Sequence, residues 1–279
     1  MRYIQTILKG IGQVMFLNNS YSGLLFLIGF FYHSWLLGLV ALSGSIISTG
    51  AAQILKYPKE EIENGIYGFN GVLIAIALWF YFGINSLTVP VLCVGAIFAT
   101  PLMYYLKKLI PPFTAPFVII TWIIIGVFIL AFKVVLPISI APKESTINLI
   151  SASAHGFSQV FFLENRISGA LFMLAVLVHS RGMAAYAIYA SLLGFATGIL
   201  LGESISSINS GLLGYNAILC GIALYGNKRS DFLWISLVII LSSLLFVGFS
   251  KIEIVILTAP FILATWIVLI LKYYIKKFG

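Results

Sequence analysis

Long apolar runs separated by short polar breaks make up most of this sequence. A helix needs about 20 mostly apolar residues to cross a bilayer, and five runs in the first half predict such helices. They cover residues 22–33 (extended at the start by 16 and 17), 35–55, 66–82, 87–106 and 117–132. Residues 1–17 are too short and too interrupted to span, so we expect there a helix lying partly in the membrane.

Three short blocks occur twice, in the same order, in the two halves of the chain. They occupy residues 13–17, 68–78 and 114–117, and they return at 159–163, 214–224 and 258–261. The first two blocks return 146 positions later and the third returns 144 positions later. A repeat of such length in an apolar chain is typical of duplicated transport proteins.

The duplication predicts the organisation of the chain. We expect a first repeat at residues 1–133, a linker at 134–153 that holds the only long polar break, and a second repeat at 154–279. Five spans is an odd number, so the second repeat must enter the membrane from the opposite side. The sequence therefore predicts an all-α integral membrane protein of two inverted five-span repeats, with ten transmembrane helices.

Composition and charge agree with this interpretation. Of the 279 residues, 61% are hydrophobic and only 9% are charged, and the mean hydropathy is +1.09, which a soluble domain does not reach. With ten spans, one side of the membrane receives 12 of the 16 basic residues: Arg2, Lys9, Lys56, Lys59, Lys107, Lys108, Arg181, Lys228, Arg229, Lys272, Lys276 and Lys277. The other side receives Lys133, Lys143, Arg166 and Lys251. The positive-inside rule then predicts that both termini are cytoplasmic.

Several classes of function are excluded by the same inventory. The net charge of +8 comes from residues in the breaks between spans, so nucleic acid is not a partner. Cys93 and Cys220 lie inside apolar runs, where we expect small packed side chains rather than a disulfide or a metal site. The three histidines, His33, His155 and His179, show no metal-ligand spacing, and neither a catalytic triad nor paired carboxylates are present. We expect no enzyme activity and no cofactor.

The first block carries a glutamine and an aromatic residue three positions apart. Gln13 with Phe16, and Gln159 with Phe162, would each share one face of a helix. An amide buried without partners costs roughly 2–7 kcal/mol, so each glutamine must face protein or a watery path. A hydrogen bond between helices is one interpretation, and lining a solute path is the other.

The second block begins with glycine, an aromatic residue and asparagine, which favours a helix start inside the apolar region. Phe69 and Tyr215 could be core residues or could face a solute, whereas Asn70 and Asn216 are better explained as helix caps.

In the third block, Thr114 and Thr258 each precede a proline by two positions. Proline suits the first turn of a helix, so each threonine is expected to cap the helix that follows. Capping does not exclude that the hydroxyl also contacts a solute.

Together the three blocks and their second copies resemble the urea transporter family, over essentially the whole chain. The resemblance implies passive, channel-like transport of urea by a homotrimer in the cell inner membrane. Each protomer would hold its own pore at the interface of the repeats, and each repeat would contain a short tilted half-membrane helix. In that family aromatic pairs flank the passing urea, amide or acidic oxygens line one side, and threonines mark the centre.

Carried over, the resemblance assigns eight residues to a selectivity filter. Phe16, Phe69, Phe162 and Tyr215 would form the slot, Gln13 and Gln159 the outer hydrogen-bonding positions, and Thr114 and Thr258 the constriction. The sequence departs from the family pattern at two glutamines where members can carry one Glu, at Tyr215 where a second Phe is common, and at Ala217 in place of a glycine.

A flat, neutral, polar solute suits such a path, because an ion would lose far more hydration energy there. No chain of acids or histidines runs through the predicted spans, so proton coupling is not indicated. The alternative is a channel of the same build for ammonia or short amides. The absence of paired histidines in mid-span disfavours ammonia, since His33 and His179 sit at span ends.

Overall fold

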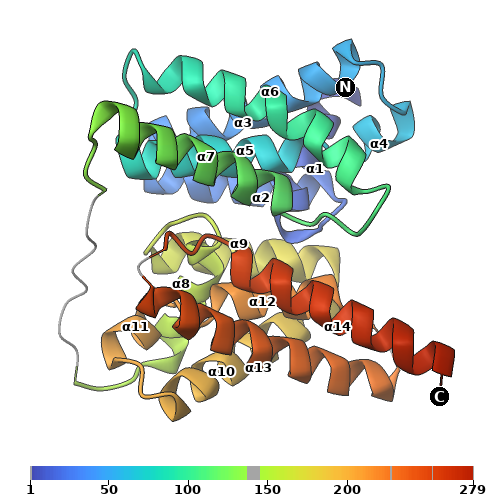
Figure 1. Cartoon of the computed structure of the whole chain (residues 1–279), viewed down its shortest axis with the longest axis vertical. Coiled ribbons are helices and arrows are strands. Elements are labelled where there is room, and N and C mark those ends of the chain that lie inside the picture. The colour runs from blue at the N-terminus through green and yellow to red at the C-terminus, as the bar shows by residue number, and fades with distance from the viewer. Residues whose placement is uncertain (1, 137–144, 227, 253, 279) are drawn as a thin grey trace. The chain divides into compact units, whose positions relative to one another are not determined.

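The computed structural model describes residues 2–136, 145–226, 228–252 and 254–278, and every regular element in these ranges is helical. Figure 1 labels most of the helices. The first half contains α1 (Arg2–Gly12), the 3₁₀ helix η1 (Gln13–Met15), α2 (Ser20–His33), α3 (Trp35–Ile54), α4 (Lys59–Glu63), α5 (Gly68–Phe82), α6 (Thr88–Leu106) and α7 (Ala115–Phe132). The second half contains α8 (Leu149–Gln159), α9 (Arg166–His179), α10 (Arg181–Leu200), α11 (Ile205–Asn209), α12 (Tyr215–Ala223), α13 (Arg229–Lys251) and α14 (Ala259–Phe278).

The apolar runs of the first half are confirmed as helices. The five runs correspond to α2, α3, α5, α6 and α7, with ends that differ from the expected ones by two residues or fewer. Of the expected linker, residues 137–144 lie outside the described residues, as does its Lys143, and α8 begins at Leu149.

Six of the described helices are long and apolar enough to cross a membrane: α3, α6, α7, α10, α13 and α14. A seventh span is possible if α1 with η1 and α2, which meet at a bend of 78°, form one broken crossing. The helices α5 and α9 are apolar but shorter. The chain is therefore a multi-pass helical membrane protein.

The chain folds as two compact units, and the same local structure occurs in each. Unit 1 comprises Met1–Ile140 with Ala170–His179, and unit 2 comprises Ala141–Gly169 with Ser180–Gly279. Both ends of α9, α10 and α11 lie 146 positions after those of α2, α3 and α4. The structural repeat of these three helices therefore has the same spacing as the repeat in the sequence.

Backbone conformations that are rare for L-residues also recur. Phe16 and Phe162 have φ angles of 61° and 60°, and Phe113 and Leu257 have φ angles of 47° and 48°. A left-handed non-glycine residue costs of order 1–3 kcal/mol, so it persists only where the surrounding structure imposes it. The two units therefore impose the same two breaks on their helices.

In each unit the crossing of two helices is close enough to require glycine. In unit 1, α3 packs on α5, and a Cβ on Gly71 would lie 2.1 Å from the hydroxyl oxygen of Ser48. In unit 2, α10 packs on α12, and a Cβ on Gly194 would lie 2.9 Å from the Cβ of Ala217. Gly194 and Ala217 occupy the positions of Ser48 and Gly71, so the glycine has moved to the other helix. This exchange explains how the second copy tolerates Ala217.

A second facing pair shows the same exchange. A Cβ on Gly44 of α3 would lie 2.9 Å from the Cβ of Ala75 on α5. At the corresponding positions of unit 2, a Cβ on Gly221 of α12 would lie 2.9 Å from the Cβ of Ala190 on α10. Each facing pair thus holds one glycine, whichever helix carries it.

We predict that Gly71→Ala destabilises the protein by about 1–3 kcal/mol, the usual cost of overpacking. The added methyl would also lie 2.4 Å from the carbonyl oxygen of Gly44, which cannot move without shifting α3. The matched control is Gly50→Ala on the facing helix α3, where a Cβ meets nothing within 4 Å. Thermal unfolding in detergent compares the two variants, and equal midpoints would contradict the close crossing.

Candidate functional site

The three duplicated blocks meet within unit 1. The short helix η1, which contains Gln13, packs against α5, and the ring of Phe16 lies edge-on to Phe113 with centroids 5.6 Å apart. The side-chain oxygen of Asn70 accepts a hydrogen bond from the backbone N–H of Phe117 at 3.0 Å. The first block thus contacts the residue just before the third block, and the second block is bonded to the third.

The bond from Asn70 satisfies the buried N-terminus of α7. The first-turn N–H groups of a helix have no partner within it. At the start of α7, the N–H of Ala115 donates to the carbonyl of Pro112, Pro116 has no N–H, and the N–H of Phe117 donates to Asn70. The expectation that the asparagines cap helices is confirmed for Asn70, although the helix it caps is α7 and not its own.

The expectation that Thr114 caps α7 through its hydroxyl is wrong. Thr114 occupies the N-cap position and is fully buried, but its side chain makes no capping hydrogen bond. The physical reason is that Asn70 of α5 already accepts from the N–H group that a threonine cap would satisfy.

Unit 2 repeats this arrangement with one added bond. The side-chain oxygen of Asn216 accepts from the N–H of Phe261 at 3.3 Å. The hydroxyl of Tyr215 donates to the carbonyl oxygen of Leu257 at 2.6 Å, in a buried position next to Thr258. Because Phe69 stands at the corresponding position of unit 1, this hydroxyl bond exists in unit 2 alone.

The first block does not place its two residues on one helix face, so that expectation is wrong. Gln13 lies in η1, whereas Phe16 lies beyond its end in a left-handed conformation, with its N–H donating to the carbonyl of Gln13 at 3.0 Å. The same turn forms in unit 2, where the N–H of Phe162 donates to the carbonyl of Gln159 at 3.0 Å. The backbone reverses because a left-handed residue ends a helix.

The two glutamines differ in their partners. Gln13 is 8% exposed, and its amide nitrogen donates to the carbonyl oxygen of Asn64 at 2.9 Å. Gln159 is partly exposed, and within the described part of the chain its side chain forms no such bond. A primary amide has two N–H donors and an acceptor oxygen, so the bond to Asn64 leaves Gln13 one N–H and the oxygen for another partner.

The aromatic residues fall into two groups by burial. Phe69 is 3% exposed and Tyr215 is 8% exposed, while Phe16 and Phe162 are partly exposed.

The eight candidate residues are divided equally between the two units. Gln13, Phe16, Phe69 and Thr114 lie in unit 1, and Gln159, Phe162, Tyr215 and Thr258 lie in unit 2.

Three neighbours of the candidate residues were not expected from the sequence. Asn64 holds Gln13, Phe113 contacts Phe16, and Leu257 accepts from Tyr215. Phe113 and Leu257 each directly precede the threonine of the third block, and that adjacency is the one signal that could have indicated them.

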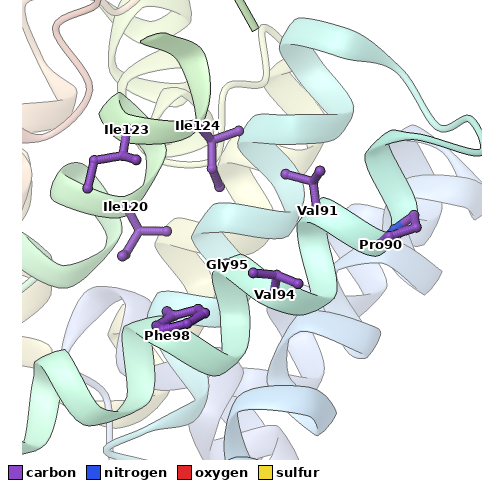
Figure 2. A pocket seen from close by; sticks show the side chains of 8 residues that line it. All are labelled: Pro90, Val91, Val94, Gly95, Phe98, Ile120, Ile123 and Ile124. Carbon is purple, nitrogen blue, oxygen red and sulfur yellow. The ribbon is translucent and has the colours of Figure 1, made fainter. Parts of the chain in front are cut away.

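A cavity of about 420 Å³ between α6 and α7 does not fit a polar solute. Figure 2 shows its lining: Pro90, Val91, Val94, Gly95, Phe98, Ile120, Ile123 and Ile124. None of these side chains offers a hydrogen bond, so the cavity is no candidate for the path. The described residues also contain no group of three or more His, Cys, Asp or Glu that could hold a metal ion.

Comparison with known proteins gives one consistent result. The family model described as "Urea transporter" matches residues 4–273. Among similar proteins, urea transporter 1 of Rattus norvegicus is 30% identical over 250 residues, and urea transporter 1 of Mus musculus and of Ovis aries are each 29% identical over 250 residues. Each match covers 81% of this chain and 64% of the relative, so the chain spans less than two thirds of the length of these proteins.

We predict that Tyr215→Phe destabilises the protein by about 1–3 kcal/mol, because the buried carbonyl of Leu257 loses its hydrogen-bond donor. The ring and its edge-on contact with Phe246 remain. The matched control is Tyr273→Phe, whose side chain is 61% exposed. Thermal unfolding of both variants decides, and equal midpoints would show that the hydroxyl bond contributes nothing.

Proposed function

Because the chain belongs to the urea transporter family, we propose that it conducts urea across a cell membrane as a passive channel. The match of residues 4–273 carries this proposal. The duplicated blocks support it independently, because in each unit an asparagine of the second block is bonded to the helix of the third. A transporter family implies no catalytic residue, and none is assigned.

The polar groups of the candidate site suit a neutral solute. Amides and hydroxyls offer both donors and acceptors, which urea needs for its carbonyl and amino groups when it loses water. None of the eight candidate residues carries a charge. An ion would lose its hydration there without a compensating charge, at a far higher cost than urea.

We propose that the eight residues act in three roles. The rings of Phe16, Phe69, Phe162 and Tyr215 flank the flat solute, Gln13 and Gln159 supply amide hydrogen bonds, and Thr114 and Thr258 mark the narrowest part. The support is the family pattern at these positions, together with the contacts that join the blocks inside each unit.

The proposed architecture has ten spans in two inverted repeats, with the short helices α2, α5, α9 and α12 counted as crossings and one tilted half-membrane helix in each repeat. The duplicated sequence, the odd number of spans in each copy and the charge asymmetry support it. We further propose a homotrimer with one pore in each protomer, in an inner membrane, with both termini cytoplasmic. Tags at the two ends should be accessible from the same side of oriented vesicles, and opposite accessibility would contradict ten spans.

Stopped-flow light scattering of proteoliposomes tests the function. We expect shrinkage under an inward urea gradient to be followed by fast recovery as urea enters, with slow recovery in glycerol and in protein-free liposomes. Ammonia and formamide gradients run in parallel. A folded protein that passes ammonia or formamide but not urea would overturn the proposal in favour of the other solute.

We predict that Phe69→Ala lowers the urea to glycerol permeability ratio, because removing the ring widens the passage. The variant should also lose about 3–5 kcal/mol of stability, the usual cost of Phe→Ala in a core. The matched control is Phe98→Ala on α6, whose side chain is 60% exposed. An unchanged ratio in folded Phe69→Ala protein would remove this ring from the path.

A further inference from the structure

A charged cluster at one end of unit 1 lies beside the candidate site without being part of it. The carboxylate of Glu61 in α4 forms an ion pair with the ammonium of Lys107, just after α6, and accepts a hydrogen bond from the hydroxyl of Tyr67, just before α5. Lys107 also donates to the hydroxyl oxygen of Tyr67 at 3.4 Å. Three connected groups thus tie the segment that precedes α5 to the end of α6.

Aromatic rings surround the lysine of this cluster. The nitrogen of Lys107 lies 5.2 Å from the ring centroid of Tyr104 and 5.7 Å from that of Tyr67. Tyr57 stacks on Tyr104 at 4.1 Å, with an angle of 7° between the rings. Aromatic rings attract an ammonium group through cation–π contacts, more strongly where water is excluded. Lys107 is therefore held by these rings as well as by Glu61.

The ionisation of the cluster fits its geometry. Burial raises the pKa of Glu61, but hydrogen bonds from Lys107 and Tyr67 and the positive charge of Lys107 lower it by more, so the net pKa lies below its usual value. Burial and the neighbouring Glu61 carboxylate raise the pKa of Tyr67. Glu61 is therefore an anion and Tyr67 a neutral donor at neutral pH.

The cluster fixes the loop that holds Gln13. Glu61 anchors the chain twice, through its side chain and through its backbone carbonyl, which accepts from the N–H of Ile66 at 3.1 Å. Asn64 lies between Glu61 and Ile66 in the chain, and its N–H donates to the carbonyl of Glu60 at 2.9 Å. The carbonyl of Asn64 is the acceptor of the Gln13 amide, so the position of Gln13 depends on this loop.

Unit 2 lacks the carboxylate and the tyrosine of this cluster at the corresponding positions. Ser207 and Leu213 stand where Glu61 and Tyr67 stand in unit 1. A different contact ties the loop there, from the ring nitrogen Nδ1 of His155 to the backbone oxygen of Asn209 at 2.7 Å. Among the described residues Gln159 has no counterpart of the Gln13 bond. The ion pair of Glu61 with Lys107 and the bond that holds Gln13 thus occur together in unit 1.

We propose that Glu61 and Lys107 are positioning residues, which set the orientation of the Gln13 amide through the carbonyl of Asn64. This inference rests on the proposed function, because it assigns Gln13 to the urea path. The two residues contact no solute themselves. They make the two glutamines unequal, with the amide of Gln13 fixed and the amide of Gln159 free to turn.

A double-mutant cycle tests the inference by urea permeability per folded protein in proteoliposomes. Glu61→Gln and Gln13→Leu should each lower permeability by about two- to tenfold, the range expected when a supporting residue alters a coupled site. In the Gln13→Leu protein, adding Glu61→Gln should change nothing further, because the amide it orients is gone. A purely structural role would move the unfolding midpoint but would leave the two permeability effects independent.

The matched control lies on the same short helix. Glu63 pairs with Lys59 at 3.9 Å in solvent, and the side chain of Lys59 is 82% exposed. Glu63→Gln removes one charge from α4, as Glu61→Gln does, and should leave permeability unchanged. Equal losses for Glu63→Gln and Glu61→Gln would overturn the inference, since net charge alone would then explain both.

Three further variants keep the test decisive if Glu61→Gln folds poorly. Tyr67→Phe removes one donor to the carboxylate and keeps the ring. Exchange of the charges, Glu61→Lys with Lys107→Glu, rebuilds the ion pair and should recover permeability that Lys107→Met loses. No recovery in a folded exchange variant would overturn the inference.

The outcomes separate this inference from the proposed function. No urea permeability in folded wild-type protein would overturn both. Urea permeability with unequal, additive effects of Glu61→Gln and Gln13→Leu would overturn the positioning role alone. Loss in Glu61→Gln with none in Gln13→Leu would also overturn it, because the effect would not pass through Gln13.

Discussion

Helix ends buried in apolar protein need hydrogen-bond partners, and this requirement organises both units. Where α7 begins, water cannot reach its first N–H groups, and an unpaired one costs about 1–3 kcal/mol. Asn70 removes that cost from within α5, and Asn216 does the same for α14 from within α12. The bond joins the second block to the third in both units, and in unit 2 the hydroxyl of Tyr215 also donates to the carbonyl of Leu257, next to Thr258.

Around this common bond the two units are stabilised differently. Unit 1 holds its first block through a polar bridge to Asn64 and a charged cluster behind it. Unit 2 ties Tyr215 to the carbonyl before Thr258. The supporting bonds of the two units have therefore diverged, while the backbone breaks at Phe16 and Phe162 have stayed the same.

Helix positions could be predicted from the sequence because an apolar run of sufficient length between polar breaks has few alternatives in a membrane. The capping asparagines were predicted in kind, but not the helix that each caps, since the contact joins residues 47 positions apart in unit 1 and 45 in unit 2. The end of η1 was missed because Phe16 carries no glycine signal for its positive φ. The bond between Gln13 and Asn64 spans 51 positions, and no local pattern indicates it.

The exchanged glycines limit what recombination could do to a gene that contains its own duplicate. If a segment encoding α12 replaced the one encoding α5, Ser48 would face an alanine copied from Ala217, with two side chains where there is room for one. At the other crossing, Gly44 would face a glycine copied from Gly221 and leave a gap. Each half can accumulate further substitutions, but a segment copied from one half no longer fits at these crossings of the other. The two copies within one chain are therefore no longer interchangeable at these helix crossings.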